Sequence, residues 1–267
     1  MKTVIAPVDF SATSRNALWF AAELCKRASA RLLIVNALQD DEAEEEAKDK
    51  LEQVRFDLQT FWPGLEIESS VAQGKLVDVL KKIREVQWPD LVVMGTKGAT
   101  GLKRILIGSN TVKVIAHTNL PVLVIPEAAQ FENFLKKGKN RVVLATDLES
   151  LETADTLDIL KEIILLIIEP KLRVLSVRPK NTSLPDLKKM ERDALLSVFS
   201  PQIESERITV FDNNVIDGID FYLKAHNDTG LLAMIARDSG ALIQKHYTRE
   251  MASYTDLPLL VLHDGDN

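Results

Sequence analysis

The feature that most constrains the fold of this chain is an internal repeat. Residues 142–147, Val-Val-Leu-Ala-Thr-Asp, echo residues 4–9, Val-Ile-Ala-Pro-Val-Asp, at an offset of 138. Residues 255–262 echo residues 118–125 at an offset of 137. Because the beginning and the end of the repeat share nearly one offset, we expect the 267 residues to form two copies of one domain.

We place the two domains at residues 1–130 and 140–265, with a polar connection between them. Each copy alternates short apolar runs with helical patterns, which is typical of a parallel sheet with helical crossovers. In the first copy we expect strands at about residues 3–8, 31–37, 66–72, 91–94 and 121–125. The helices between them are expected at about 13–29, 42–60, 76–87 and 109–117. In the second copy we expect strands near 141–146, 172–177, 207–212, 230–235 and 258–262.

Composition favours a globular protein and argues against two other classes. Hydrophobic residues make up 46% and charged residues 27%, and no apolar run approaches the ~20 residues of a membrane helix. The net charge of −6 argues against a general nucleic-acid binder. The acidic excess lies after residue 137, so the first copy is better suited to bind an anion. A single cysteine, Cys25, and no recognisable signal peptide favour a cytoplasmic protein.

The segment most informative about function is the glycine-rich stretch of residues 95–109, which follows a predicted strand and precedes a predicted helix. Glycines allow backbone N–H groups to approach a ligand, and a helix N-terminus carries partial positive charge. This layout is suited to phosphate. The spacing matches neither of the two common phosphate-binding motifs, so from the residues alone a plain turn stays open beside a phosphate site.

These segments together resemble the universal stress protein family. Its ATP-binding members carry Gly-x2-Gly-x9-Gly-Ser/Thr, and this chain fits that spacing with Gly95, Gly98, Gly108 and Ser109. The resemblance extends upstream to residues 4–9, which end in Pro-x-Asp, and downstream to residues 120–126. It therefore covers residues 1 to about 130.

The resemblance implies a stress-response regulatory protein that binds one ATP, with Mg²⁺, in its first copy. It implies a Rossmann-like fold of the adenine nucleotide alpha hydrolase type, with the two five-stranded copies packed as a pseudo-dimer. The expected nucleotide-binding residues are Pro7, Val8, Asp9, Ala37, Met94, Gly95, Gly98, Gly108, Ser109, Asn110 and Thr111. No catalytic residue and no dedicated metal ligand are expected. An unidentified protein partner and a further homodimer are left open.

Several of these residues have a simpler interpretation on sequence grounds. Asp9 is also placed to cap the first helix, and we expect Ser109 to be the N-cap of the fourth. Ala37 and Met94 fit a plain hydrophobic core. The positive charges nearby, Lys97, Lys103 and Arg104, are equally suited to a solvent-exposed loop.

The second copy departs from the glycine pattern. Gly240 alone stands where three glycines are needed, Asp238 would bring a like charge to a phosphate, and the Gly-Ser corner falls near Lys245 and His246. We therefore expect this copy to keep the fold without a triphosphate site. No hydrolytic motif is recognisable, so two alternative functions remain: a very slow ATPase, or an interaction protein without nucleotide turnover.

Overall fold

The computed structural model describes residues 1–39, 44–96, 108–130, 138–237 and 257–264. The chain divides into two compact units, Met1–Phe131 and Glu132–Asn267. Within the described residues each unit contains a sheet of five parallel strands. The α/β fold with two repeated five-stranded sheets, predicted from the repeat, is confirmed.

The strands of the first unit lie in the order β3-β2-β1-β4-β5. Their bounds are β1 (Thr3–Pro7), β2 (Arg31–Leu38), β3 (Ile67–Gln73), β4 (Leu91–Gly95) and β5 (Val122–Ile125). The central strand β1 is buried along its whole length, because helices cover both faces of a parallel sheet. The edge strand β3 has a single buried residue, Ile67. The strands predicted for the first copy agree with these bounds to within about two residues.

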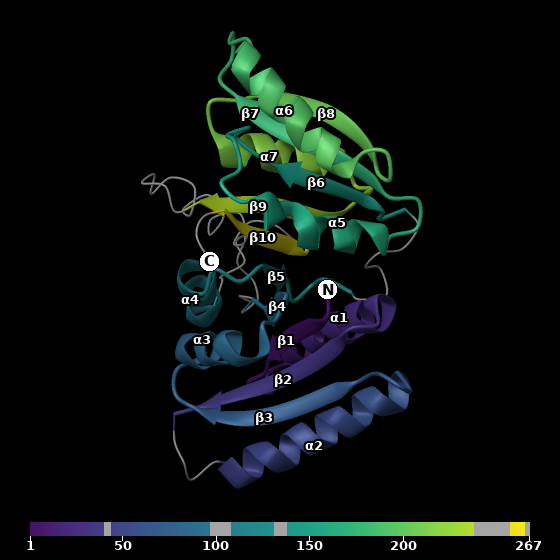
Figure 1. Ribbon diagram of the computed structural model, residues 1–267, viewed down its shortest axis with the longest axis vertical. Helices are drawn as coiled ribbons and strands as arrows, with labels where there is room; N and C mark the ends of the chain where they lie inside the picture. The colour runs from purple at the N-terminus through teal and green to yellow at the C-terminus, as the bar shows by residue number, and fades with distance from the viewer. Residues whose placement is uncertain (40–43, 97–107, 131–137, 238–256, 265–267) are drawn as a thin grey trace. The chain divides into compact units, whose positions relative to one another are not determined.

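Four helices cover this sheet, two on each face, as right-handed crossovers require. They are α1 (Ala12–Ala28), α2 (Glu44–Phe61), α3 (Leu76–Gln87) and α4 (Ser109–His117). Figure 1 shows α1 and α2 on one face and α3 and α4 on the other. The first helix begins where the side chain of Ser11 accepts a hydrogen bond from the Ser14 N–H.

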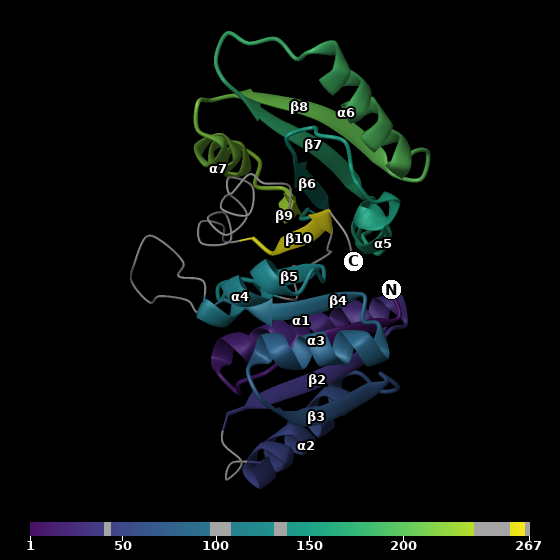
Figure 2. The same ribbon diagram turned by 60° about the vertical axis from the view of Figure 1, so that its left-hand side comes forward.

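The second unit repeats the plan, with strands in the order β10-β9-β6-β7-β8. The strand bounds are β6 (Arg141–Ala145), β7 (Lys171–Arg178), β8 (Glu204–Phe211), β9 (Thr229–Arg237) and β10 (Leu259–Asp264). The helices are the 3-10 helix η3 (Ala154–Leu157), α5 (Asp158–Leu165), α6 (Asp186–Phe199) and α7 (Val215–Ala225). Figure 2 shows α5 and α6 on one face of this sheet and α7 on the other.

The arrangement of the first unit fixes where a ligand can bind. Strand β1 pairs with β2 on one side and with β4 on the other, so the connections leave β1 and β4 in opposite directions. At such a point the loops diverge beyond the carboxyl ends of the strands and open a crevice.

Among the described residues, no helix is both long enough and apolar enough to cross a membrane.

Candidate functional site

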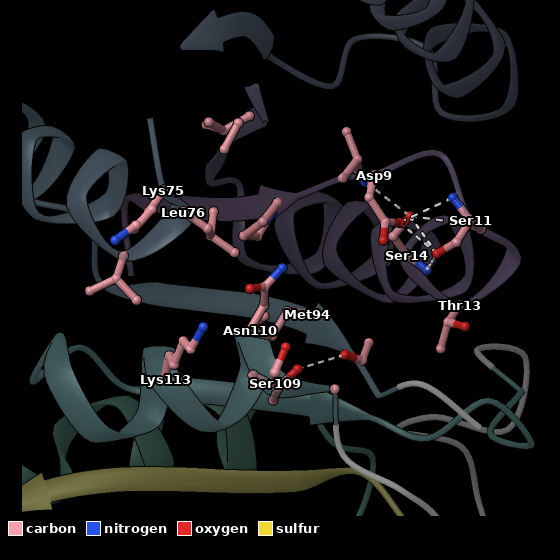
Figure 3. A pocket seen from close by; sticks show the side chains of 18 of the residues that line it. Asp9, Ser11, Thr13, Ser14, Lys75, Leu76, Met94, Ser109, Asn110 and Lys113 are labelled. Carbon is pink, nitrogen blue, oxygen red and sulfur yellow. Dashed lines mark hydrogen bonds between the residues drawn. The ribbon is translucent and has the colours of Figure 1, made fainter. Parts of the chain in front are cut away.

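The first unit has a cavity of about 490 Å³ at the carboxyl ends of its central strands, within the range of small-molecule sites. Its walls come from the ends of β1, β2 and β4, from the first turns of α1 and α3, and from one side of α4. Figure 3 shows Asp9, Ser11 and Ser14 on one side of the cavity and Lys75 and Lys113 on the other.

Ten of the eleven residues expected to bind nucleotide line this cavity, although sequence positions up to about 100 residues apart contribute to it. They are Pro7, Val8, Asp9, Ala37, Met94, Gly95, Gly108, Ser109, Asn110 and Thr111. The eleventh, Gly98, lies outside the described residues, as do Lys97, Lys103 and Arg104. The structure brings the ten residues together, while their contact with a ligand stays a prediction.

Asp9 follows β1 and lies in a tight hydrogen-bonded turn. Its Oδ1 accepts from the Ser11 N–H at 3.1 Å and from the Ser11 hydroxyl at 2.5 Å. Partial burial raises the pKa of Asp9, but the hydrogen bonds from Ser11, Ser14 and the backbone lower it by more. The pKa is therefore below its usual value, and the carboxylate is charged at neutral pH.

Asp9 is not the N-cap of α1, as its simpler interpretation from the sequence proposed. The N-cap residue is Ser11, and Asp9 supports the cap by accepting hydrogen bonds from Ser11. Beside it, the buried Asn36 donates from Nδ2 to the Val8 carbonyl at 2.7 Å and so fixes the end of β1. The start of α1 thus positions the Asp9 carboxylate, and β2 positions the end of β1 from which Asp9 follows.

The N-terminus of α4 lines the opposite wall, and its N-cap is Gly108 rather than the expected Ser109. Gly108 has φ −59° and ψ 142° and offers no side chain to cap the first-turn N–H groups. Ser109 and Asn110 are exposed, and both line the cavity. A helix start that faces a cavity and has no side-chain cap among the described residues is suited to an anion, because its N–H groups and dipole both favour negative charge.

The side chain of Thr111 makes a hydrogen bond within the protein. Its hydroxyl donates to the Gly95 carbonyl at 3.0 Å, which ties the first turn of α4 to the end of β4. Gly95 itself is required by packing: a Cβ there would lie 2.6 Å from the backbone oxygen of Thr13 in α1. This requirement exists whether or not a ligand binds.

Apolar residues form the remaining walls. Val8 and Met94 are 6% and 5% exposed, and Pro7 is buried as well. Ala37 lies at the end of β2 and is half-buried. The combination of apolar walls, a carboxylate and an open helix start suits a ligand with a flat apolar part and an anionic part.

The sequence reasoning missed the segment Gly74–Asp78 and eight single residues that also line the cavity: Ser11, Thr13, Ser14, Val35, Gln39, Thr96, Lys113 and His117. Gly74 has φ +124°, which favours glycine, and its N–H donates to the Leu38 carbonyl at 2.7 Å. The sequence signal that could have identified this segment was Gly74, a glycine directly after the third strand. The third strand also ends at the carboxyl edge of the sheet, where ligands bind. Lys75 and Lys113 have no ion-pair partner among the described residues, so two cations and one carboxylate, Asp78, line this part of the cavity.

A metal site built by the protein alone is absent from the part of the chain that the structure describes, where no three His, Cys, Asp or Glu residues cluster. Mg²⁺ commonly binds through one or two carboxylates together with phosphates. Asp9 fits that role, because it is charged and lines the cavity.

The corresponding edge of the second unit is held by ion pairs. Asp147, the counterpart of Asp9 at the repeat offset, lies 3.5 Å from Nη1 of Arg237, which is 5% exposed. Nε of Arg237 lies 3.2 Å from Oδ2 of Asp264, and Nη2 donates to the Glu149 carbonyl at 2.7 Å. The second-copy residues predicted to lack phosphate binding, Asp238, Gly240, Lys245 and His246, lie outside the described residues.

Known proteins resemble parts of this chain in sequence. The sequence model of the universal stress protein family matches residues 1–126. Universal stress protein MJ0577 of Methanocaldococcus jannaschii is 38% identical over 81 residues, which are 30% of this chain and 49% of that protein. The match thus spans about half the length of this relative. Universal stress protein MJ0531 of the same organism is 28% identical over 140 residues, covering 46% of this chain and 81% of that protein.

Solved structures resemble the chain over nearly its whole length. The crystal structure of a universal stress protein from Archaeoglobus fulgidus DSM 4304 has a TM-score of 0.78 and 19% identity, covering 98% of each chain. At this identity the likeness shows the fold.

Proposed function

We propose that this chain, whose residues 1–126 match the sequence model of the universal stress protein family, binds one adenine nucleotide, ATP, in its first unit and acts as a regulatory module of the stress response. The observation that carries the proposal is the cavity of about 490 Å³, lined by the ten described residues that the family pattern selects.

The charges around the cavity support a ligand with both a nucleoside and phosphates. The open start of α4 and the cations Lys75 and Lys113 favour negative charge. The Asp9 carboxylate is an acceptor suited to ribose hydroxyls or to Mg²⁺ held between protein and phosphates. Affinity should therefore rise from adenosine through AMP to ATP.

A regulatory role is favoured over rapid hydrolysis by the chemistry of Asp9. A general base works best when its pKa lies near the operating pH. The pKa of Asp9 is lowered below its already acidic usual value, so this carboxylate is a weak base for activating water. The alternatives are a very slow ATPase and an interaction protein that does not turn nucleotide over.

Calorimetric titration with adenosine, AMP, ADP and ATP in Mg²⁺ tests the proposal. We expect one site per chain and the tightest binding for ATP. Gly108→Val should abolish binding, because a side chain at this position blocks the approach of phosphate to the first-turn N–H groups of α4. Its φ of −59° is open to any residue, so the fold should persist.

Gly64→Ala is the matched control. Gly64 lies outside the cavity and a Cβ there meets no atom within 4 Å, but its φ of +79° strains any side chain. The variant should therefore melt lower than the wild type and still bind ATP as the wild type does, which shows that destabilisation alone does not remove binding. Two equivalent sites, no binding of any adenine nucleotide, or full binding by Gly108→Val would each contradict the proposal.

A further inference from the structure

Thr96 carries a buried hydroxyl that makes no hydrogen bond with any described residue. The residue is 0% exposed, follows the last residue of β4 and lines the cavity of the first unit. Its Oγ1 has no hydrogen-bond partner among the described residues. Buried polar groups nearly always have a partner, so an orphaned hydroxyl in a cavity wall calls for a physical explanation.

The other buried hydroxyls of the cavity wall are satisfied by the protein. Ser14 donates from Oγ to the Ser11 carbonyl at 3.1 Å, and Thr111 donates to the Gly95 carbonyl at 3.0 Å. Thr96 differs from them although its backbone is well fixed, since its N–H donates to the Ile125 carbonyl at 3.0 Å. The sheet therefore determines the position of the Thr96 backbone, while its hydroxyl has no hydrogen-bond partner among the described residues.

The direction of the Thr96 side chain follows from its neighbour. A Cβ on Gly95 would point at Thr13 of α1. Because successive residues of an extended strand point to opposite faces, Thr96 points to the face that α3 and α4 cover. The hydrogen bond from Thr111 to Gly95 holds the first turn of α4 against this same strand end. The orphaned hydroxyl and the uncapped first turn of α4 thus belong to one wall.

From this geometry we propose that Thr96 is a specificity-determining residue whose hydroxyl donates a hydrogen bond to an anionic phosphate oxygen of the bound nucleotide. The inference rests on the proposed function and deepens it, because it assigns the phosphate end of the ligand to the wall between Thr96 and α4. A hydroxyl can rotate its single proton toward such an oxygen, and hydrogen bonds to charged groups are the stronger ones.

The test uses the full chain and two substitutions of Thr96. Thr96→Val keeps the shape and removes the hydroxyl, so ATP affinity should fall about 10-fold to 100-fold, the usual range for losing a hydrogen bond to a charged group. Affinity for adenosine should be unchanged, since it carries no phosphate. Thr96→Ser retains the hydroxyl and should retain ATP affinity.

Thermal unfolding without ligand separates this role from a structural one. Replacing an unsatisfied buried hydroxyl by a methyl group should leave the melting temperature equal or higher. Thr118→Val is the matched control: Thr118 is also buried, at 2% exposure, but its hydroxyl donates to the Val114 carbonyl at 2.8 Å. The control should melt lower than the wild type and bind ATP normally.

Each other outcome has a distinct meaning. If wild type binds neither ATP nor inorganic tripolyphosphate, both the proposed function and this inference are overturned. If wild type and Thr96→Val bind ATP equally, the inference fails and the proposed function stands. An equal loss for ATP and adenosine, or a lower melting temperature for unliganded Thr96→Val, also overturns the assignment of this hydroxyl to phosphate.

Discussion

The substitution Gly95→Ala separates packing from ligand binding at the end of β4. A Cβ at this position would lie 2.6 Å from the backbone oxygen of Thr13, 2.9 Å from its carbonyl carbon and 3.0 Å from its Cγ2. The contact to the oxygen must open from 2.6 Å to about 3.4 Å to become an ordinary one. Either the start of α1 or the end of β4 has to move.

Neither side can move freely. The start of α1 is held by the Ser11 cap, in which the Ser14 N–H donates to Ser11 Oγ at 3.2 Å. The end of β4 is held by its pairing with Ile125 of β5 and by the hydrogen bond from Thr111. Overpacking typically costs about 1–3 kcal/mol, and a clash with fixed backbone belongs in the upper half of that range. Replacing a strand glycine by alanine returns about 0.5–1 kcal/mol.

The net destabilisation is therefore about 1–2.5 kcal/mol, which lowers the melting temperature of the first unit by about 4–9 °C. Urea and thermal unfolding of the unliganded protein measure it. The control is Gly218→Ala, where a Cβ would also lie 2.6 Å from its nearest neighbour. The neighbours there are side-chain atoms, Cγ1 and Cγ2 of Val177 and Cβ of Asp212, rather than backbone. Alanine is also favoured over glycine within helix α7, so a smaller loss than for Gly95→Ala is expected. Gly95→Ala unfolding like the wild type would refute the reasoning.

Four further predictions concern other parts of the molecule. Asp264→Asn should destabilise the second unit by about 1–3 kcal/mol in urea unfolding, because it removes the fully buried one of the two carboxylates paired with Arg237 and leaves only Asp147; no measurable loss would contradict this. Burial raises the pKa of Asp228, but the hydrogen bonds from Arg173 lower it by more, to a net pKa below the usual value. The resulting stabilisation should be full above about pH 4 and disappear as the pH falls through the folded pKa, and Asp228→Asn should abolish this part of the pH profile. Magnesium-ATP turnover should stay well below about 1 s⁻¹, the low end of ordinary enzymes; faster turnover that Gly108→Val removes would argue for an enzyme. Burial raises the pKa of the Cys25 thiol, so it should react with a thiol reagent only after unfolding.

Much of the fold could be predicted because it depends on local patterns. Runs such as Leu91–Met94 and the helical spacing of residues 76–87 repeat along the chain with the periods of strand and helix, and the observed elements begin and end within a few residues of the predicted ones. The family spacing selected ten residues that line a single cavity, because glycines and an aspartate at strand ends belong to the carboxyl edge of a parallel sheet. The packing of the two copies as a pseudo-dimer stays a prediction.

Other features were decided only by tertiary structure. Whether Gly108 or Ser109 caps α4 differs by one residue, a difference that depends on how the loop meets the helix. The charge of Asp9 depends on Ser11 and Ser14 being folded back onto it.

The sequence by itself therefore determined two α/β copies and the neighbourhood of the site, because periodicity and turn chemistry are local properties of the chain. Only the tertiary structure decided what each residue does there. Gly95 is required by Thr13, which lies 82 positions earlier in the sequence, and Thr96 keeps a buried hydroxyl that neither β5 nor α4 satisfies. Such close approaches and unmade hydrogen bonds depend on how distant segments pack, and no local pattern in the sequence encodes them.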